Sequence, residues 1–244
     1  MQFIAFVCTF LTVKNMVLKQ LPKNNGIVLQ GEKAMKETHI LALCMIAAVI
    51  SFLGFVVENV WLTATKGYID NRNMCFPFLL GYGIAILLIF IILGTPKKLW
   101  FFGNVIPIKS KLLKTLLYFL GVMICVSVGE IIIGTFVEKT CHFCWWDYTQ
   151  LPMHITQYTS IPTSAMFSSL ITFFMDYLFA PLYHYFSVWN YNTLHSVASI
   201  LCAIMIGDFL YNSYKMYKTK GLVIRWTRIT KGSWLYRRLH EADS

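Results

Sequence analysis

Five long apolar segments constrain this chain more than any other feature of its sequence. Each is 18 to 23 residues long, and they cover residues 39–61, 76–93, 112–134, 163–180 and 194–211. An α-helix needs about 20 apolar residues to cross a bilayer. Single strands would leave their backbone hydrogen-bonding groups unpaired in lipid. The segments therefore predict membrane-spanning helices.

Composition agrees with this interpretation. Hydrophobic residues make up 57% of the chain and charged residues only 13%, whereas a soluble domain has about 25% charged residues. Lipid must therefore cover much of the surface. We expect an all-α, polytopic transmembrane helix bundle in a prokaryotic cytoplasmic membrane. Three regions follow: a short apolar segment with a Lys-rich cytoplasmic lead-in (1–38), a transmembrane helical domain (39–212) and a basic cytoplasmic tail (213–244).

Basic residues predict the orientation. Most of the 21 Lys and Arg residues lie in the lead-in, in the linker 97–114 and in the tail, which the positive-inside rule places in the cytoplasm. Five crossings would put the tail outside. Segment 163–180 is the least apolar, so we expect it to enter the membrane and turn back; a sixth crossing or a tail that violates the rule are the alternatives. We expect the basic tail to meet anionic headgroups rather than nucleic acid.

Acidic residues interrupt the apolar segments. A carboxylate at mid-membrane costs about 2.5–3.5 kcal/mol on insertion scales, so it should face protein or a water-filled cavity. Each acid shares a helical face or a neighbouring turn with small or polar residues, which allows helix–helix contact, a shared polar cavity for a substrate or proton, or snorkelling to the membrane surface. The four acids are Glu58, Glu130, Asp176 and Asp208.

Two stretches resemble each other. Residues 51–77 and 127–152 each contain a small residue, a Glu within a helix, an outward loop with an Asp, and a Pro before the next segment. Internal duplication is common in transporters, with the site at the interface between the repeats. We expect such a duplication here, with chance similarity as the alternative.

The most distinctive short motif is CHFCWWDY at residues 141–148. Trp145, Trp146 and Tyr148 suit a membrane–water interface, because an amphipathic ring there has one wet edge. Packing at this interface is the simplest interpretation of the motif, and Asp147 lies within it.

The CxxC pair Cys141 and Cys144 allows three sharper interpretations. One is a disulfide to Cys75 in the first loop, and another is a redox dithiol. A metal site needs about four ligands, for which His142 and His154 would have to join. Because no second CxxC exists, we expect no metal site and no cofactor.

Several enzyme motifs are absent from the sequence. It has no GxxxxGK[ST] loop, so it cannot bind ATP in the P-loop manner. It also has no HExxH and no GxSxG, and we expect no enzymatic activity. The short run Gly81-Tyr82-Gly83 lacks the context of a nucleotide-binding loop and favours close helix packing.

A family resemblance covers residues 45–185. The order and spacing of several residues resemble the bacterial integral membrane family described as "putative ABC-transporter type IV", or CmpB-like permeases. The matching run is Glu58, Asn71-Arg72, Pro77, Gly81-Tyr82-Gly83, Glu130, Trp145-Trp146-Asp147-Tyr148 and Pro152. By this resemblance, the positions of greatest interest are Glu58, Asn71, Arg72, Pro77, Gly81, Gly83, Glu130, Trp146 and Asp147.

The resemblance implies a permease-type subunit that relies on a separate ATPase. In this hypothesis Glu58 and Glu130 line a polar path, and Arg72 and Asp147 form its outer mouth. Expected partners are the lipid bilayer, an ATPase subunit and a second copy of the chain. Two alternatives stay open: a membrane scaffold or regulatory partner that transports nothing, and a membrane thiol oxidoreductase that uses Cys141 and Cys144.

Overall fold

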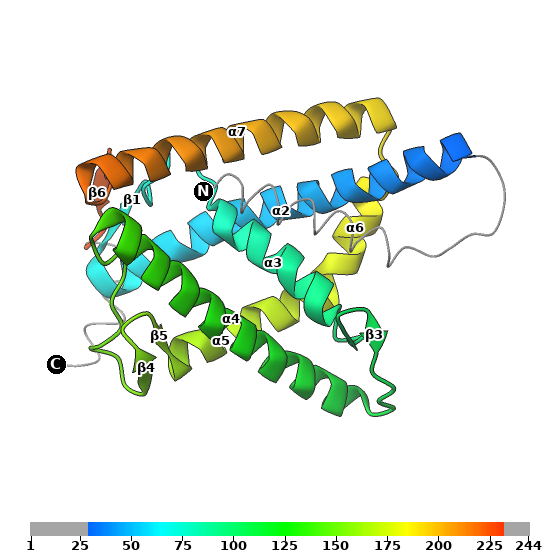
Figure 1. The fold of residues 1–244 in the computed structure, drawn as a ribbon, viewed down its shortest axis with the longest axis horizontal. Helices are drawn as coiled ribbons and strands as arrows, with labels where there is room; N and C mark the ends of the chain where they lie inside the picture. The colour runs from blue at the N-terminus through cyan, green and yellow to red at the C-terminus, as the bar shows by residue number, and fades with distance from the viewer. Residues whose placement is uncertain (1–28, 232–244) are drawn as a thin grey trace.

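The computed structural model describes residues 29–231, and within that range the chain folds mainly as helices (Figure 1). The initial apolar segment 1–13 and the end of the basic tail lie outside the described residues. Five continuous helices follow one another: α2 (Leu29–Lys66), α3 (Leu80–Leu93), α4 (Lys111–Cys141), a third long helix made of α5 (Ile161–Phe173), the π-helical turn η1 (Phe174–Leu178) and α6 (Phe179–Ser187), and finally α7 (Tyr191–Thr219).

Four of these helices are long and apolar enough to cross a membrane: Glu37–Lys66 of α2, α4, Ile161–Ser187 and α7. The fifth, α3, has 14 residues and is about 21 Å long at 1.5 Å per residue, which is less than the bilayer core of about 30 Å. The segment expected over 76–93 was therefore too long. Residues up to Leu79, including Pro77, belong to the preceding loop.

The expected re-entrant segment over 163–180 is wrong. These residues belong to the continuous helix 161–187, which does not turn back (Figure 1). Pro181 lies inside α6 rather than after it. Proline lacks an N–H, and its ring crowds the carbonyl four residues earlier, here that of Tyr177. The wide turn of η1 directly precedes α6, where Phe179 N–H donates to the Phe174 carbonyl, and the helix continues past the proline.

Short antiparallel strand pairs occupy the loops of the described region. Strand β2 (Trp100–Phe101) pairs with β3 (Asn104–Val105), and β4 (His154–Thr156) pairs with β5 (Thr159–Ser160). The third pair joins distant parts of the chain. Strand β1 (Tyr68–Asp70) follows α2, and β6 (Thr227–Ile229) follows α7.

The β1–β6 pair fixes one end of the molecule. Helices α2 and α7 run side by side in the same direction (Figure 1). The Tyr191 hydroxyl, at the start of α7, donates to Glu37 near the start of α2 (2.8 Å). The described part of the tail therefore lies beside the 67–79 loop. The expectation that placed this loop outside and the tail in the cytoplasm is wrong, because both lie at one end.

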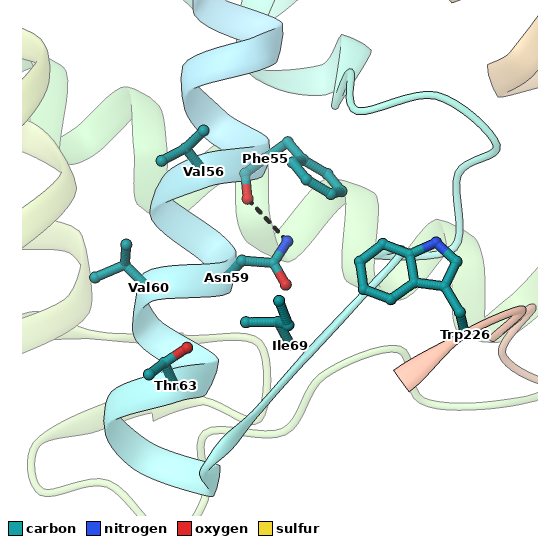
Figure 2. Close-up of a pocket in the computed structure, with 7 residues that line it drawn as sticks. All are labelled: Phe55, Val56, Asn59, Val60, Thr63, Ile69 and Trp226. Carbon is teal, nitrogen blue, oxygen red and sulfur yellow. Dashed lines mark hydrogen bonds between the residues drawn. The ribbon is translucent and has the colours of Figure 1, made fainter. Parts of the chain in front are cut away.

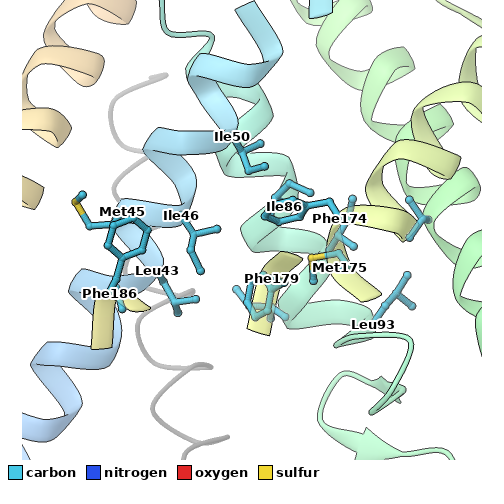
Figure 3. Close-up of a cluster of buried hydrophobic side chains, with 14 of the residues drawn as sticks. Leu43, Met45, Ile46, Ile50, Ile86, Leu93, Phe174, Met175, Phe179 and Phe186 are labelled. Carbon is cyan, nitrogen blue, oxygen red and sulfur yellow. The ribbon is translucent and has the colours of Figure 1, made fainter. Parts of the chain in front are cut away.

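The apolar core lies between α2, α3 and the α5–η1–α6 helix (Figure 3). Ile46 and Ile50 of α2 face Ile86 of α3, with Phe174 and Phe179 beside them. Each such side chain contributes about 1.5–3 kcal/mol when it is fully buried. The apolar side chains of α4 differ in that many are exposed, as a lipid-facing helix requires.

Glycine sets the distance between α2 and α3. A Cβ at Gly83 would lie 2.5 Å from the Ala47 carbonyl oxygen and 2.6 Å from the Ser51 hydroxyl oxygen. That serine hydroxyl is itself fixed, since it donates to the Ala47 carbonyl (2.7 Å). A Cβ at Gly81 would meet nothing within 4 Å. The two glycines of the GYG run therefore have different roles.

We expect Gly83→Ala to lower the stability of the protein in detergent by about 1–3 kcal/mol, because the added methyl group would push backbone away from backbone. Gly81→Ala is the matched control, and it should be neutral or stabilising by about 0.5–1 kcal/mol, since alanine favours a helix. Thermal unfolding followed by size-exclusion chromatography measures both. Equal melting temperatures for the two variants would contradict the close contact.

Single-cysteine variants test the shared end of the loop and the tail. A membrane-impermeant maleimide should label native Cys75 and Arg228→Cys from the same side of the membrane, because residue 228 pairs with Ile69. Lys109→Cys, just before α4, should react only from the other side. Labelling of intact cells and of inverted vesicles distinguishes the sides. Reaction of Cys75 and Arg228→Cys from opposite sides would refute the β1–β6 pairing.

Candidate functional site

Glu58 is held by two partners from different elements. Arg72 of the 67–79 loop donates from Nη2 to Oε2 of Glu58 (2.9 Å). Tyr82, in the first turn of α3, donates from its hydroxyl to Oε1 of the same carboxylate (2.6 Å). A charged donor and a phenol thus satisfy both oxygens of an acid that an apolar helix carries. Charge-assisted hydrogen bonds of this kind are among the strong ones.

The loop geometry presents Arg72 to α2. Arg72 has φ 47°, a left-handed conformation that non-glycine residues seldom adopt. Asp70 stabilises this turn by accepting a hydrogen bond from the Arg72 backbone N–H (2.7 Å). The N–H of Asp70 is in turn bonded to Oδ1 of Asn59 in α2 (2.9 Å). Two successive contacts therefore anchor the turn to the helix that carries Glu58.

Glu130 comes to the same place from α4. Its electrostatic neighbours are the Glu58 carboxylate and the hydroxyls of Thr159 and Ser164. Its Oε2 atom is buried, with no hydrogen-bond partner in the described part of the chain. Glu58 and Glu130 are thus electrostatic neighbours, although no direct bond joins them, and the expectation that they line a polar path stays a prediction.

Tyr148 completes this group from the loop between α4 and α5. Burial and the nearby carboxylates of Glu130 and Glu58 raise the pKa of Tyr148, and the Arg72 guanidinium opposes the shift. We call Glu58, Arg72, Tyr82, Glu130 and Tyr148 the Glu58–Glu130 cluster. It gathers residues from three helices and two loops at one end of the molecule.

Asp208 has a different role, because it fastens the 67–79 loop to α7. Its carboxylate accepts hydrogen bonds from the backbone N–H groups of Cys75 (2.9 Å) and Phe76 (3.0 Å). Asn212, one turn later, also donates to it (2.6 Å). Arg225 of the tail donates from Nη2 to Oδ1 of Asn212 (2.6 Å). Asp208 is therefore fully engaged in structural contacts.

Asn71 holds the tail to the loop. Its side-chain amide donates to the Val223 carbonyl (3.0 Å) and to the Met74 carbonyl (3.0 Å). Its Oδ1 accepts from the Arg225 backbone N–H (2.9 Å). Asn71 is buried, so the residue next to Arg72 is an anchor rather than part of a polar path.

Asp176 stands apart from the other acids. It lies in η1, about 18 Å along the helix from Ser164 at 1.5 Å per residue. It is 5% exposed, and its Oδ1 is buried without a hydrogen-bond partner among residues 29–231. Asp176 therefore does not share the surroundings of Glu58 and Glu130, and a single polar core with four acids stays a prediction.

The aromatic residues of the 142–160 loop pack against one another and hold the loop in a folded conformation. Trp146 donates from Nε1 to the Tyr158 carbonyl (2.8 Å) and packs against Trp145, with ring centroids 5.8 Å apart. Asp147 is exposed and accepts from the Thr149 N–H (2.8 Å), which holds the pKa of Asp147 below its usual range. Asp147 is bonded within its own loop, and Arg72 is bonded to Glu58 and to the Asp70 turn.

The cysteines do not form the disulfide that the sequence allowed. Cys75, Cys141 and Cys144 are all free thiols. Cys141 is buried beside Met216 of α7, whereas Cys144 donates to the Trp146 carbonyl (2.9 Å). Burial and the Asp147 and Glu138 carboxylates raise the pKa of Cys144, and a redox-active CxxC pair needs the opposite shift. No group of three or more His, Cys, Asp or Glu side chains suited to a metal ion occurs in the described region.

A shallow groove of about 270 Å³ opens elsewhere on α2. Figure 2 shows it between the helix and the segments around β1 and β6, with Asn59 bonded to the Phe55 carbonyl. Val56, Val60 and Thr63 line it and share the helix face opposite Glu58. The groove therefore does not open onto the Glu58–Glu130 cluster.

The fold and the cluster define a polytopic helical membrane protein with converging polar groups at one end. A family model described as "Putative ABC-transporter type IV" matches residues 45–213, so the chain belongs to that family, a family of membrane transport. No curated protein and no solved structure is significantly similar to the chain.

Sequence reasoning missed several residues of the site. The Gly81-Tyr82-Gly83 run predicts close packing alone, whereas the Tyr82 hydroxyl also donates to Glu58; a phenol in the first turn of an apolar helix is a natural partner for a nearby acid. Thr159 and Ser164 lie next to Glu130 only because α5 folds back on α4. Arg225 belongs to the basic tail that we expect to meet anionic headgroups, and no local signal points to Asn212 as its partner.

The raised pKa of Cys144 predicts slow alkylation. A variant that keeps Cys144 as its only cysteine should react with iodoacetamide more slowly at pH 7 when folded than when unfolded. Less thiolate is present below a raised pKa, so the rate should climb as the pH rises through it. Mass spectrometry of timed samples measures the rate. Faster reaction in the folded protein would revive the thiol oxidoreductase hypothesis.

Proposed function

We propose that the chain is the permease-type subunit of a transport system and that the Glu58–Glu130 cluster forms part of its polar path. One observation supports this most: two acids from separate apolar helices lie close enough for their charges to interact, at one end of the bundle. Glu58 and Glu130 approach each other even though like charges repel, so their proximity has a cost that helix packing alone does not require.

Unsatisfied atoms in the cluster favour a binding role over mere helix contact. A purely structural polar network has all of its members paired, because an unpaired buried polar atom costs about 1–3 kcal/mol. Here Oε2 of Glu130 and Nε of Arg72 are buried without a hydrogen-bond partner in the described region. An acceptor and a cationic donor are thus free to meet a polar substrate.

Access supports the same role. The side chains of Arg72 and Glu58 are 25% and 24% exposed, so this part of the cluster reaches the surface near the 67–79 loop. Glu130 lies deeper, beside the buried hydroxyls of Thr159 and Ser164. A polar solute would meet Arg72 and Glu58 first and Glu130 second.

The remaining parts of the proposal concern energy and assembly. The chain has no P-loop sequence, so an ATP-driven system would need a separate ATPase subunit. The proposed location is the cytoplasmic membrane. The exposed apolar residues of α4, such as Leu112, Ile124 and Ile132, would contact lipid or a second copy.

The test compares Glu58→Gln with Glu37→Gln in cells that make equal amounts of protein. Both acids lie on α2, and both accept a hydrogen bond from a tyrosine hydroxyl, but Glu37 is at the far end. Cells with wild-type protein should differ from deletion cells in at least one small molecule, measured by mass spectrometry of extracts. Glu58→Gln should lose that difference, and Glu37→Gln should keep it. Full accumulation with Glu58→Gln would remove this acid from the mechanism.

Affinity purification in mild detergent tests the partner. A co-purifying protein with a P-loop, in stoichiometric amount, is the expected result, and Glu58→Gln should retain it because the change is confined to the proposed polar path. A stable signalling or envelope partner in place of an ATPase would instead support the scaffold alternative.

A further inference from the structure

The groove on α2 lies apart from the proposed polar path, and most of its lining is apolar (Figure 2). Three of its apolar side chains are well exposed: Val56 at 39%, Val60 at 52% and Trp226 at 46%. Its amide, Asn59, is already bonded through both polar atoms, because it donates to the Phe55 carbonyl (3.1 Å) and accepts from a backbone N–H of β1 (2.9 Å). The groove therefore suits a hydrocarbon chain better than a polar solute.

The groove follows the last turns of α2, and a basic residue lies at their end. Val56, Thr63 and Lys66 share one face of the helix, at spacings of seven and three residues. At 1.5 Å per residue, the stretch from Val56 to Lys66 covers about 15 Å, which is half of a hydrocarbon core of about 30 Å. An acyl chain of a single leaflet has this extent, and its headgroup would then lie beside Lys66.

A second basic residue reaches the groove through the β1–β6 pair. Arg228 is directly opposite Ile69, which lines the groove, and the side chains of opposite residues share one face of a sheet. Trp226, two residues before Arg228, also lines the groove, as the two-residue alternation of an extended chain requires. Arg228 therefore emerges on the groove side, next to an indole ring of the kind that favours the membrane–water interface.

Neither basic side chain is neutralised by an acid within residues 29–231. The ion pairs of this region involve Arg72, and both Lys66 and Arg228 are exposed. The acid next to the groove, Asp70, follows Ile69 in β1, so its side chain lies on the other face of the strand. There it accepts from the Arg72 backbone N–H (2.7 Å). This end of the groove therefore carries a net positive charge.

We propose that the groove binds an acyl chain of an anionic phospholipid, whose headgroup Lys66 and Arg228 hold. Each basic residue near an anionic membrane surface favours binding about fivefold. The Arg228 guanidinium can also donate two parallel hydrogen bonds to one phosphate, while Trp226 packs against the adjacent part of the acyl chain. This site does not rest on the proposed transport function, since it needs neither a transported solute nor an ATPase.

Quenching of Trp226 fluorescence by brominated lipids tests the site. The full-length protein is placed in phosphatidylcholine nanodiscs that contain a minor fraction of either phosphatidylglycerol or phosphatidylcholine with brominated acyl chains. Subtracting the fluorescence of Trp226→Phe isolates the signal of Trp226 from that of the other tryptophans. Brominated phosphatidylglycerol should quench this signal at a lower fraction than brominated phosphatidylcholine does, and added salt should reduce the preference because it screens the charges.

Variants separate the headgroup contacts from the groove. Arg228→Gln and Lys66→Gln should each lower the preference for phosphatidylglycerol about fivefold, whereas Arg228→Lys keeps the charge and should keep most of the preference. Lys109→Gln, the matched control, removes a charge at the other end of the molecule and should leave the preference unchanged. Val60→Phe fills the groove and should weaken quenching by both brominated lipids. Size-exclusion chromatography checks that each variant is folded.

Three results would overturn the proposal. Equal quenching by the two brominated lipids in the wild-type protein would mean that the headgroup is not recognised. An equal loss of preference in Lys109→Gln would assign the preference to the charge of the whole protein. A Trp226 signal that neither lipid quenches would show that another part of the chain or a second copy covers the groove. Failure of the transport test would leave all of these measurements unaffected.

Discussion

An acid in an apolar helix must find its partners inside the protein, and the contacts of Glu58 organise one end of this molecule. Arg72 and Tyr82 reach it from a loop and from the next helix. Neither can do so unless the chain reverses tightly after α2. Three features stabilise that reversal. They are the left-handed turn at Arg72, the contact of Asp70 with Asn59, and the close approach of α2 to α3.

The acids of the chain occupy three different environments. Glu58 and Glu130 are electrostatic neighbours, with a cation and two phenols nearby. Asp208 is saturated by backbone N–H groups and by an asparagine. Asp176 is buried, and its Oδ1 has no hydrogen-bond partner within residues 29–231. Because a carboxylate's chemistry depends on its partners, these residues are suited to different tasks despite their similar positions in apolar sequence.

The class of fold and the helical segments could be predicted from the sequence, because long apolar runs have few alternatives in lipid. The cost of leaving acids in lipid predicts that Glu58 and Glu130 face protein, and their shared polar path stays a prediction. The length of α3 was not, since apolar residues 76–79 belong to the loop. The continuity of helix 161–187 could not be predicted, because a proline such as Pro181 normally ends a helix. Here the wide turn of η1 lets the helix continue past it. The proposed duplication stays a prediction.

Charge rules misled most at the tail. Counting Lys and Arg residues predicts the side of the membrane and ignores specific contacts of the tail. The Arg225 side chain donates to Asn212, and its backbone N–H donates to Asn71. The pairing of β1 with β6 is a contact between distant segments, and no local pattern announces it. Contacts of this kind depend on the folded arrangement of α2 and α7 rather than on any property of the tail alone.

The anchoring of the loop to α7 has a mechanical consequence. Arg72 lies between two anchored positions of the loop. On one side, Asn71 donates a hydrogen bond to the tail. On the other, the backbone N–H groups of Cys75 and Phe76 donate to Asp208 of α7. Hydrogen bonds on both sides of Arg72 therefore tie this turn to the last turns of α7 and to the segment that follows them. A force applied to the tail from outside the bilayer would be transmitted to the Glu58 carboxylate through these contacts. The source of the force would not need to contact Glu58 itself.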